Sequence, residues 1–306
     1  TFLTTLPPAF ATTPAAATNG PKRSMMTVTS DAATLSIAAL ALVNHATAFN
    51  NGRVEGSLQQ MLGESLTLGG STAVGGDLFV PGTPTVVVNG SPVFGGIVDG
   101  LGSTNPTGYT ITLSSNSSLG HLVRRTDPVA IPTVSAPSTP TGTRSVTLRN
   151  SNQSVDDWAT VRNLTVQSGV GQIQVPAGAY GDFKASGDSG FTLGVIGTSE
   201  PTVYHFQSLT LNSGAQIQVI GRVIIVLGNG FSINGGTVGN SANPAWLTLN
   251  IFAGNLSINQ GASVYGYVTA PAGIVTINGA GQLVGGLASD GLGINSNAWL
   301  RLSPSP

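Results

Sequence analysis

A short apolar run that ends in a turn residue recurs along the chain. The clearest copies are LSIN ending at Asn259, VTIN ending at Asn278 and LGIN ending at Asn295, at intervals of 19 and 17 residues. Earlier copies end at Asn89, Asn212 and Asn234. Within each copy the apolar residues lie two apart, which is the period of a β-strand. Asn-Gly and Gly-Gly pairs divide the runs and favour tight turns.

A strand–turn unit of about 20 residues cannot bury its apolar face alone and needs stacked neighbours, which is the logic of a solenoid. We therefore predict an all-β fold, a parallel β-helix in which each coil adds about 4.8 Å along the axis. Ile, Val and Leu should form inward ladders, and the recurrent Asn should stack at the corners or line a ligand-binding row. A β-sandwich also uses short alternating strands, but does not require the same motif in every unit.

Composition restricts the classes of partner. The chain has 42 Gly, 18 Pro, 8% charged residues and a net charge of −1, so little repulsion opposes self-association. Nucleic acid is not an expected partner because no basic face is available. With no Cys the chain forms neither disulfides nor thiolate metal sites. No apolar run is long enough for a membrane span. A start at Thr1 without Met is compatible with export, and we predict an extracellular or cell-surface location.

The domain organisation follows from the repeats and the Pro-rich segments. Residues 1–29 are rich in Pro, Ala and Thr and read as an extended tail, which packs on a neighbouring subunit or on its own chain. Residues 30–302 form a single β-helix domain, followed by a short tail at 303–306. Residues 31–50 are either a capping helix or the first coil, and we predict the coil. The Pro-rich run at 127–142 should leave the sheet as an excursion or a crossing loop, because Pro cannot serve in central strands.

Catalytic constellations are sparse. A polysaccharide-cleaving β-helix needs clustered carboxylates, and the one adjacent acidic pair, Asp156 and Asp157, points to opposite faces if it lies in a strand. The surrounding SVDDWATVR resembles the acidic motif of polygalacturonase-like β-helices, whose companion Gly-His-Gly and Arg-Ile-Lys motifs are missing. His45, His121 and His205 lack metal-ligand spacing. We predict a protein that is not an enzyme, with no catalytic residue, cofactor or metal.

Two surface patterns leave a binding role open. Thr recurs in strands at Thr165, Thr210, Thr248 and Thr276, but we find no Thr-x-Thr ladder across successive coils of the kind that binds ice. Tyr204 with Phe206, and Tyr265 with Tyr267, are spaced to share a strand face, where they could form a sugar-binding platform. Surface glycans are possible at the sequons of Asn116, Asn152, Asn163 and Asn255.

One region carries a family resemblance. The stretch from TVYHFQSLTLN to NSNAWLRL, residues 202–302, resembles the β-helical domain of unknown function in bacterial PilX-like pilus-assembly and surface proteins. Its coils are also similar to those of bactofilins, which polymerise end to end. Residues 66–100 share the pattern more weakly. The resemblance implies a β-helix at the cell surface, and it carries over no catalytic residue.

These observations predict a structural protein, the self-assembling subunit of a bacterial surface filament, pilus-like appendage or matrix. Association as a homo-oligomer or homopolymer should use the coil ends and the N-terminal tail. The candidate contacts are Phe2 and Leu3 in the tail, with Trp299 and Leu300 in what should be the terminal coil. The alternative is an adhesin or a carbohydrate- or ice-binding module, and a polysaccharide-active enzyme is the third hypothesis.

Overall fold

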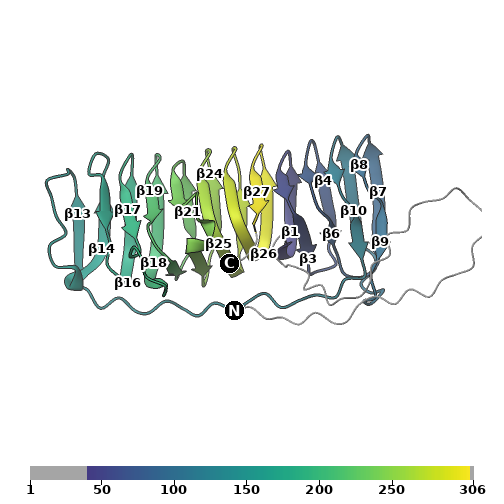
Figure 1. The fold of residues 1–306 in the computed structure, drawn as a ribbon. Helices are drawn as coiled ribbons and strands as arrows, with labels where there is room; N and C mark the ends of the chain where they lie inside the picture. Colours follow the sequence, from purple (N-terminus) through teal and green to yellow (C-terminus); the bar gives the residue numbers. More distant parts are fainter. Residues whose placement is uncertain (1–39, 304–306) are drawn as a thin grey trace, which may run out of the picture. The chain divides into compact units, whose positions relative to one another are not determined.

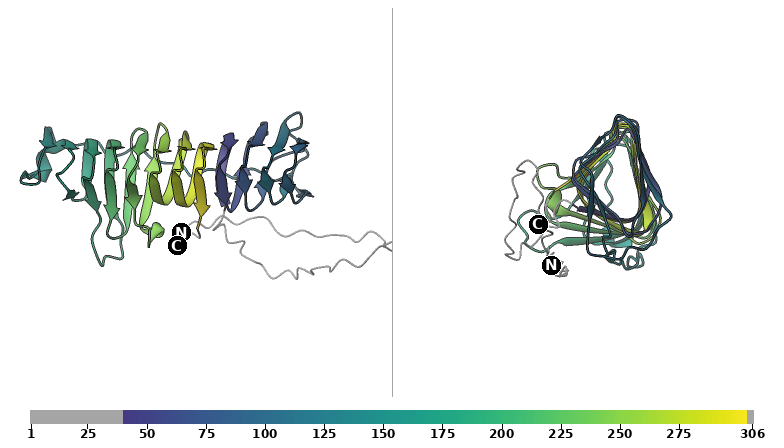
Figure 2. Two further views of the ribbon diagram at one scale, coloured as in Figure 1. Left: turned by 90° about the horizontal axis from the view of Figure 1, so that it is seen from above. Right: turned by 90° about the vertical axis from the view of Figure 1, so that its right-hand side faces the viewer.

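The computed structural model describes residues 40–303, and it confirms the parallel β-helix. These residues form an all-β solenoid of about 11 turns (Figure 1). All strand pairings are parallel, and the strands follow three faces around a packed core, as the end-on view in Figure 2 shows. No helix in the described range is long and apolar enough to cross a membrane.

The strands fall into two consecutive stacks. The N-terminal stack contains β1 (Leu40–Asn50), β2 (Arg53–Glu55), β3 (Ser57–Gln60), β4 (Leu66–Gly69), β5 (Ala73–Val74), β6 (Leu78–Phe79), β7 (Thr85–Gly90), β8 (Val93–Phe94), β9 (Ile97–Asp99), β10 (Thr110–Ser115), β11 (Ser118–Leu119) and β12 (Leu122–Arg124). The C-terminal stack contains β13 (Arg144–Leu148), β14 (Val161–Val166), β15 (Gln172–Gln174), β16 (Gly178–Ser186), β17 (Gly190–Leu193), β18 (Thr202–Asn212), β19 (Gln216–Val219), β20 (Val223–Leu227), β21 (Phe231–Asn234), β22 (Thr237–Gly239), β23 (Leu247–Ile251), β24 (Leu256–Asn259), β25 (Ser263–Ile277), β26 (Gln282–Asn295) and β27 (Trp299–Leu302). Two short 3-10 helices, η2 (Trp158–Thr160) and η3 (Pro244–Trp246), interrupt the second stack.

The order of the coils in space differs from their order in the chain. The first strand, β1, lies between β26 on one side and β3 and β4 on the other. Strand β10 inserts between β4 and β7, so the β7–β9 coil is outermost in the N-terminal stack. Along one face the series is therefore β7, β10, β4, β1, β26, β25, β24, β21, β18, β16, β14 and β13.

This order corrects one prediction. The final coil is not an end of the solenoid, because β27 pairs with β2 and β26 pairs with β1. The first and last coils cover each other's edges. Within the described residues, the two ends are instead the β7–β9 coil and the β13 coil, both of which come from the middle of the sequence.

The Pro-rich excursion is the connection that this order requires. Residues 126–143, which we call the strap, contain no strand and run from β12 back past the coils to β13 (Figure 1). Ten coil intervals separate β10 from β13, or about 48 Å at roughly 4.8 Å each. In extended polyproline geometry the 18 residues of the strap reach about 56 Å, at about 3.1 Å per residue. The strap is thus only slightly longer than the distance it spans.

The strap also contacts the coils it crosses. Gln59 Nε2 donates a hydrogen bond to the Asp127 carbonyl over 3.0 Å, and the Ser138 amide donates to His205 Nδ1 over 3.2 Å. Pro140 is buried. The predicted excursion at 127–142 is therefore an ordered crossing segment that covers part of one face.

The core is a set of inward apolar columns, as the alternation predicts. Ile233, Ile258 and Ile277 follow one another in register, and all three are fully buried. Each such side chain contributes about 1.5–3 kcal/mol relative to an exposed one. Tyr204 and Phe206 belong to this core, each 1% exposed, so the surface platform left open for this pair is excluded.

Some predictions fall outside the described residues. The chain divides into two compact units, residues 1–36 and 37–306, of which the structure describes only residues 40–303. The tail at 1–29, with Phe2 and Leu3, lies outside this range, as do residues 304–306. Within the ambiguous segment at 31–50, residues 40–50 form a strand of the first coil, as predicted.

Candidate functional site

The two ends of the described solenoid differ in how they are finished. At the β13 end the loop of residues 149–160 folds over the core. Val155 in this loop is only 4% exposed, and Arg144 Nη2 donates a 2.6 Å hydrogen bond to its carbonyl. Trp158 packs edge-on against Tyr180 with ring centroids 6.1 Å apart. We call this the capped end.

The adjacent acidic residues lie in that cap rather than in a strand. Asp157 is the N-cap of η2 and accepts a 3.0 Å hydrogen bond from the Ala159 amide. The Asp156 carboxylate accepts a hydrogen bond from the Ser154 hydroxyl. Both carboxylates thus have local partners that hold the turn.

The opposite end is an apolar surface, which we call the open coil and define as residues 85–101. Five of the eleven large hydrophobic side chains that are exposed in the described residues belong to it, and they are 44–71% exposed: Val88, Val93, Ile97, Val98 and Leu101. Val88 and Ile97 are in register with Leu113 and Leu122, which are fully buried one coil further in. The open coil therefore presents core positions to solvent.

The backbone of the open coil is unpaired on its outer side. Within the described residues, β7 pairs with β10 alone, β8 with β11 alone and β9 with β12 alone. An exposed strand edge presents free N–H and C=O groups that can pair with another chain, and edges are usually protected by Lys, Pro or a bulge. The β7 sequence TVVVNG carries none of these, and the one charge in β9, Asp99, is paired with Arg124 at 2.8 Å.

A second candidate surface follows the strands that end in the recurrent Asn, and we call it the Asn face. The Asn side chains at 212, 234, 259, 278 and 295 form a continuous ladder along the axis. In each step the amide nitrogen donates to the preceding amide oxygen over 3.2–3.3 Å. Asn89 lies apart from this ladder, in the open coil, where its neighbour in register is Ser114.

A column of hydroxyl groups runs beside the Asn ladder, two residues earlier in each strand. In register along the axis it contains Thr147, Thr165, Thr210, Ser232, Ser257 and Thr276, and Lys184, which has no hydroxyl, interrupts it between Thr165 and Thr210. Thr276 is in register with Gly293, which ends the run of hydroxyls, and Thr67 and Thr112 face each other further along in the N-terminal stack. The column is not evident from the Thr residues alone, because Ser fills two of its positions and Lys184 interrupts it. Thr248 is not a member, since β23 lies on another face.

Trp299 and Leu300 belong to β27, at the junction of the two stacks. There β26 and β27 of the C-terminal stack pair with β1 and β2 of the N-terminal stack. We call this junction the seam. Leu300 is fully buried and in register with Val54. The Trp299 ring lies against the guanidinium groups of Arg53 and Arg301, at 4.9 and 4.4 Å. The prediction that these residues sit at an exposed coil end is therefore wrong.

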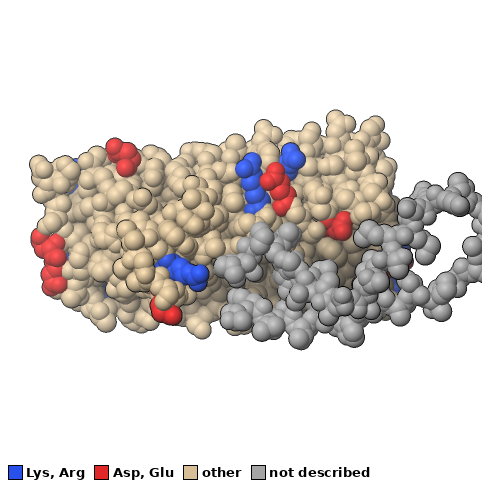
Figure 3. All heavy atoms as spheres, in the orientation of Figure 1, with Lys and Arg blue, Asp and Glu red and all other residues tan. Residues whose placement is uncertain are grey.

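Charge is concentrated at the same junction. Glu55 Oε2 lies 3.4 Å from Arg301 Nε across the seam, and Glu55 Oε1 lies 3.8 Å from Arg53 Nε in the same strand. In Figure 3 a mixed group of charged side chains stands over β27 and the neighbouring β1 coil, whereas the other charged side chains on this face are scattered. Tyr265 lies in the same row as Arg301, because Tyr265 is in register with Val284 and Val284 with Arg301. The Tyr265 hydroxyl accepts a 3.3 Å hydrogen bond from Gln282.

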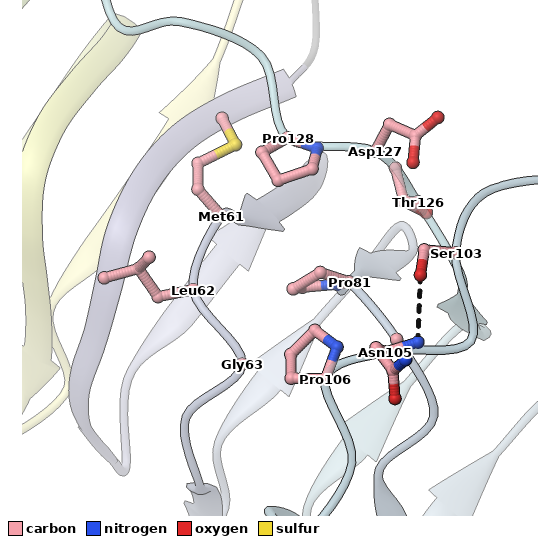
Figure 4. Close-up of a pocket in the computed structure, with 11 residues that line it drawn as sticks. Met61, Leu62, Gly63, Pro81, Ser103, Asn105, Pro106, Thr126, Asp127 and Pro128 are labelled. Atoms are coloured by element: carbon pink, nitrogen blue, oxygen red, sulfur yellow. Dashed lines mark hydrogen bonds between the residues drawn. The ribbon is translucent and has the colours of Figure 1, made fainter.

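A small cavity of about 190 Å³ lies beside the strap at the N-terminal stack (Figure 4). Its walls are mostly apolar and include Met61, Pro81 and Pro106, and Asp127 is its one charged lining residue. The Asn105 amide donates a 3.1 Å hydrogen bond to Ser103 Oγ at its edge. Among the described residues, no group of three or more His, Cys, Asp or Glu side chains converges to hold a metal ion.

The three histidines each have a separate partner. His45 Nδ1 lies 2.7 Å from Glu64 Oε2, and His121 Nδ1 lies 3.0 Å from Asp77 Oδ1. His205 accepts the hydrogen bond from the strap described above. Their contacts tie neighbouring coils or the strap together rather than forming a common site.

Comparison with known proteins adds no family. No family model matches the chain, and neither a curated protein nor a solved structure is significantly similar to it. The resemblance to PilX-like proteins and bactofilins therefore stays a prediction.

Proposed function

We propose that this chain is a structural, self-assembling β-solenoid of a bacterial surface filament, appendage or matrix, without enzymatic activity. The observation that carries the proposal is the open coil, which combines exposed core positions with an unpaired strand edge. Apolar area removed from water stabilises a contact by about 25 cal/mol per Å². Backbone hydrogen bonds along β7 would in addition set the relative orientation of the two chains.

The difference between the two ends favours a particular first contact. One end is capped and the other is open, so two open coils related by a two-fold axis make a closed pair. Such an axis, perpendicular to the face that contains β7, brings β7 against its own copy in antiparallel orientation. Assembly of more than two copies needs a second contact surface on the chain.

The test is the mass of the purified chain in solution as a function of concentration, by light scattering or sedimentation. We expect the native chain to dimerise and Val88→Lys to stay monomeric, because a charge at β7 opposes burial of the edge. Ile196→Lys is the matched control, since Ile196 is 77% exposed but lies in the loop after β17, and it should dimerise normally. A native chain that stays monomeric throughout, or a Val88→Lys variant that dimerises like the control, contradicts the proposal.

A second candidate function is an adhesin or a carbohydrate- or ice-binding module, and the hydroxyl column beside the Asn ladder favours it. From Thr210 to Thr276 the column presents a hydroxyl in every coil, at a spacing of about 4.8 Å, next to amides held in place by the ladder. Binding to insoluble polysaccharides and inhibition of ice recrystallisation test this role. Thr276→Tyr should abolish binding by disrupting the flat face, and Thr192→Tyr, an outward position on β17 of another face, should not. Absence of both activities in the native chain would remove this candidate.

A further inference from the structure

The seam joins two parts of one chain that have no short connection. Strands β26 and β27 pair with β1 and β2 along the whole coil, from Leu42 opposite Ala288 to Glu55 opposite Arg301. The strap is the only covalent link between the two stacks. The seam therefore has the properties of a protein–protein interface that happens to form within one chain.

The side chains at the seam make it specific. Asn44 Nδ2 donates a 2.8 Å hydrogen bond to Asp290 Oδ1, and His45 Nε2 lies 3.8 Å from the same oxygen. Further along, Glu55 approaches Arg301 as described above. These side-chain contacts make the pairing of β1 and β2 with β26 and β27 specific. Backbone hydrogen bonds alone would form equally well with the edge of any other coil.

Strap length decides whether one chain can close its own seam. The strap reaches about 56 Å and the path from β10 to β13 is about 48 Å, so the margin is only two or three residues. An intramolecular contact is most favoured when linker and span match, and it is lost when the linker cannot reach.

We propose that the seam is an exchangeable interface whose alternative partner is a second copy of this chain. The N-terminal stack of one copy docks on the C-terminal stack of another through the same registered pairs, which is domain swapping. Because the two sides of the seam differ, repeated docking makes a linear series of two-stack solenoids joined by straps. The inference does not depend on the open coil, and it supplies a second surface for growth.

The absence of Cys in the native chain permits a direct test. Asn50 and Asn295 are neighbours in register across the seam, and adjacent strands bring Cα atoms to a separation that a disulfide can bridge. In a Val88→Lys background, which disables the open coil, the pair Asn50→Cys and Asn295→Cys should form an intramolecular disulfide and run as a monomer on a non-reducing gel.

The decisive variant deletes residues 133–138 from the strap in that background. Its remaining 12 residues reach about 37 Å, too short for closure, so we expect disulfide-linked dimers and longer series. A Gly-Ser insertion of equal length at the same site is the matched control and should give the intramolecular product. A deletion variant that forms only the intramolecular disulfide overturns the proposal.

A second measurement covers the case in which the deletion variant does not fold. Two differently tagged copies of the double-Cys chain with the native strap are unfolded together and refolded at rising concentration before oxidation. We expect disulfides between the two tags in a fraction that grows with concentration. Intramolecular disulfides alone at every concentration would overturn the exchange.

Discussion

The Asn ladder makes a quantitative prediction, with Asn259→Ala as the perturbation. Asn259 donates to Asn234 over 3.2 Å and accepts from Asn278 over 3.3 Å, so the substitution removes two side-chain hydrogen bonds. Such bonds contribute about 0.5–1.5 kcal/mol each. Because these are long and half-exposed, the lower part of that range applies, and we expect a loss of about 1–1.5 kcal/mol in the free energy of unfolding.

Position in the ladder provides the controls. Asn212 is the end member and makes one ladder bond, so Asn212→Ala should cost about half as much. Asn89 has Ser114 as its neighbour in register and lies outside the ladder, so Asn89→Ala should change stability by less than about 0.5 kcal/mol.

Equilibrium unfolding in urea gives the free energy of unfolding of all three variants. The slope of this free energy against urea concentration should stay that of the native chain. Equal losses for the three substitutions would mean that Asn acts through its intrinsic turn preference and not through the ladder. A loss at Asn259 no greater than at Asn212 would equally refute the reasoning, because the number of bonds removed would then be irrelevant.

Two further predictions concern the core and the pH dependence of stability. Leu300→Ala should lower the free energy of unfolding by about 2–5 kcal/mol, since Leu300 is buried between Val54 and Leu283; a small loss in urea unfolding would contradict the interior position of the last coil. Burial raises the pKa of Tyr109 and of Tyr180 to about 12. Between about pH 10 and pH 12 the two hydroxyls therefore stay protonated in the folded chain, whereas Tyr in the unfolded chain is already ionised. The free energy of unfolding should fall as the pH rises through this range. Tyr180→Phe should make that fall shallower when unfolding free energy is followed across the pH range, and an unchanged slope would show that Tyr180 does not contribute.

Much of the fold could be predicted from short stretches of sequence. In LSIN and VTIN the alternation alone determines that Ile258 and Ile277 point inward and that Asn259 and Asn278 point outward. Stacking of such units in register then follows from their need to bury one face. Period two likewise places Tyr204 and Phe206 on one face, and the structure shows that this is the inner face, where no sugar-binding platform can form.

The candidate surfaces could be predicted only in part. The solenoid does have an exposed coil end. The sequence pointed to Trp299 and Leu300 for this end, whereas the structure exposes Val88 and Ile97. Similarly, the hydroxyl column was invisible because its members come from strands whose register along the axis is a property of the stack.

The sequence by itself thus determined the repeating unit, the inward and outward side chains, the corner Asn residues and the departure of the Pro-rich segment from the sheet. Only the tertiary structure decided the order of the coils, and with it the open coil, the capped end and the seam. The physical reason is that parallel strand edges offer the same backbone hydrogen bonds to any neighbour. Which coils become neighbours therefore depends on contacts between residues far apart in the sequence, such as Glu55 and Arg301 across the seam. It also depends on a strap that is just long enough for these coils to pair.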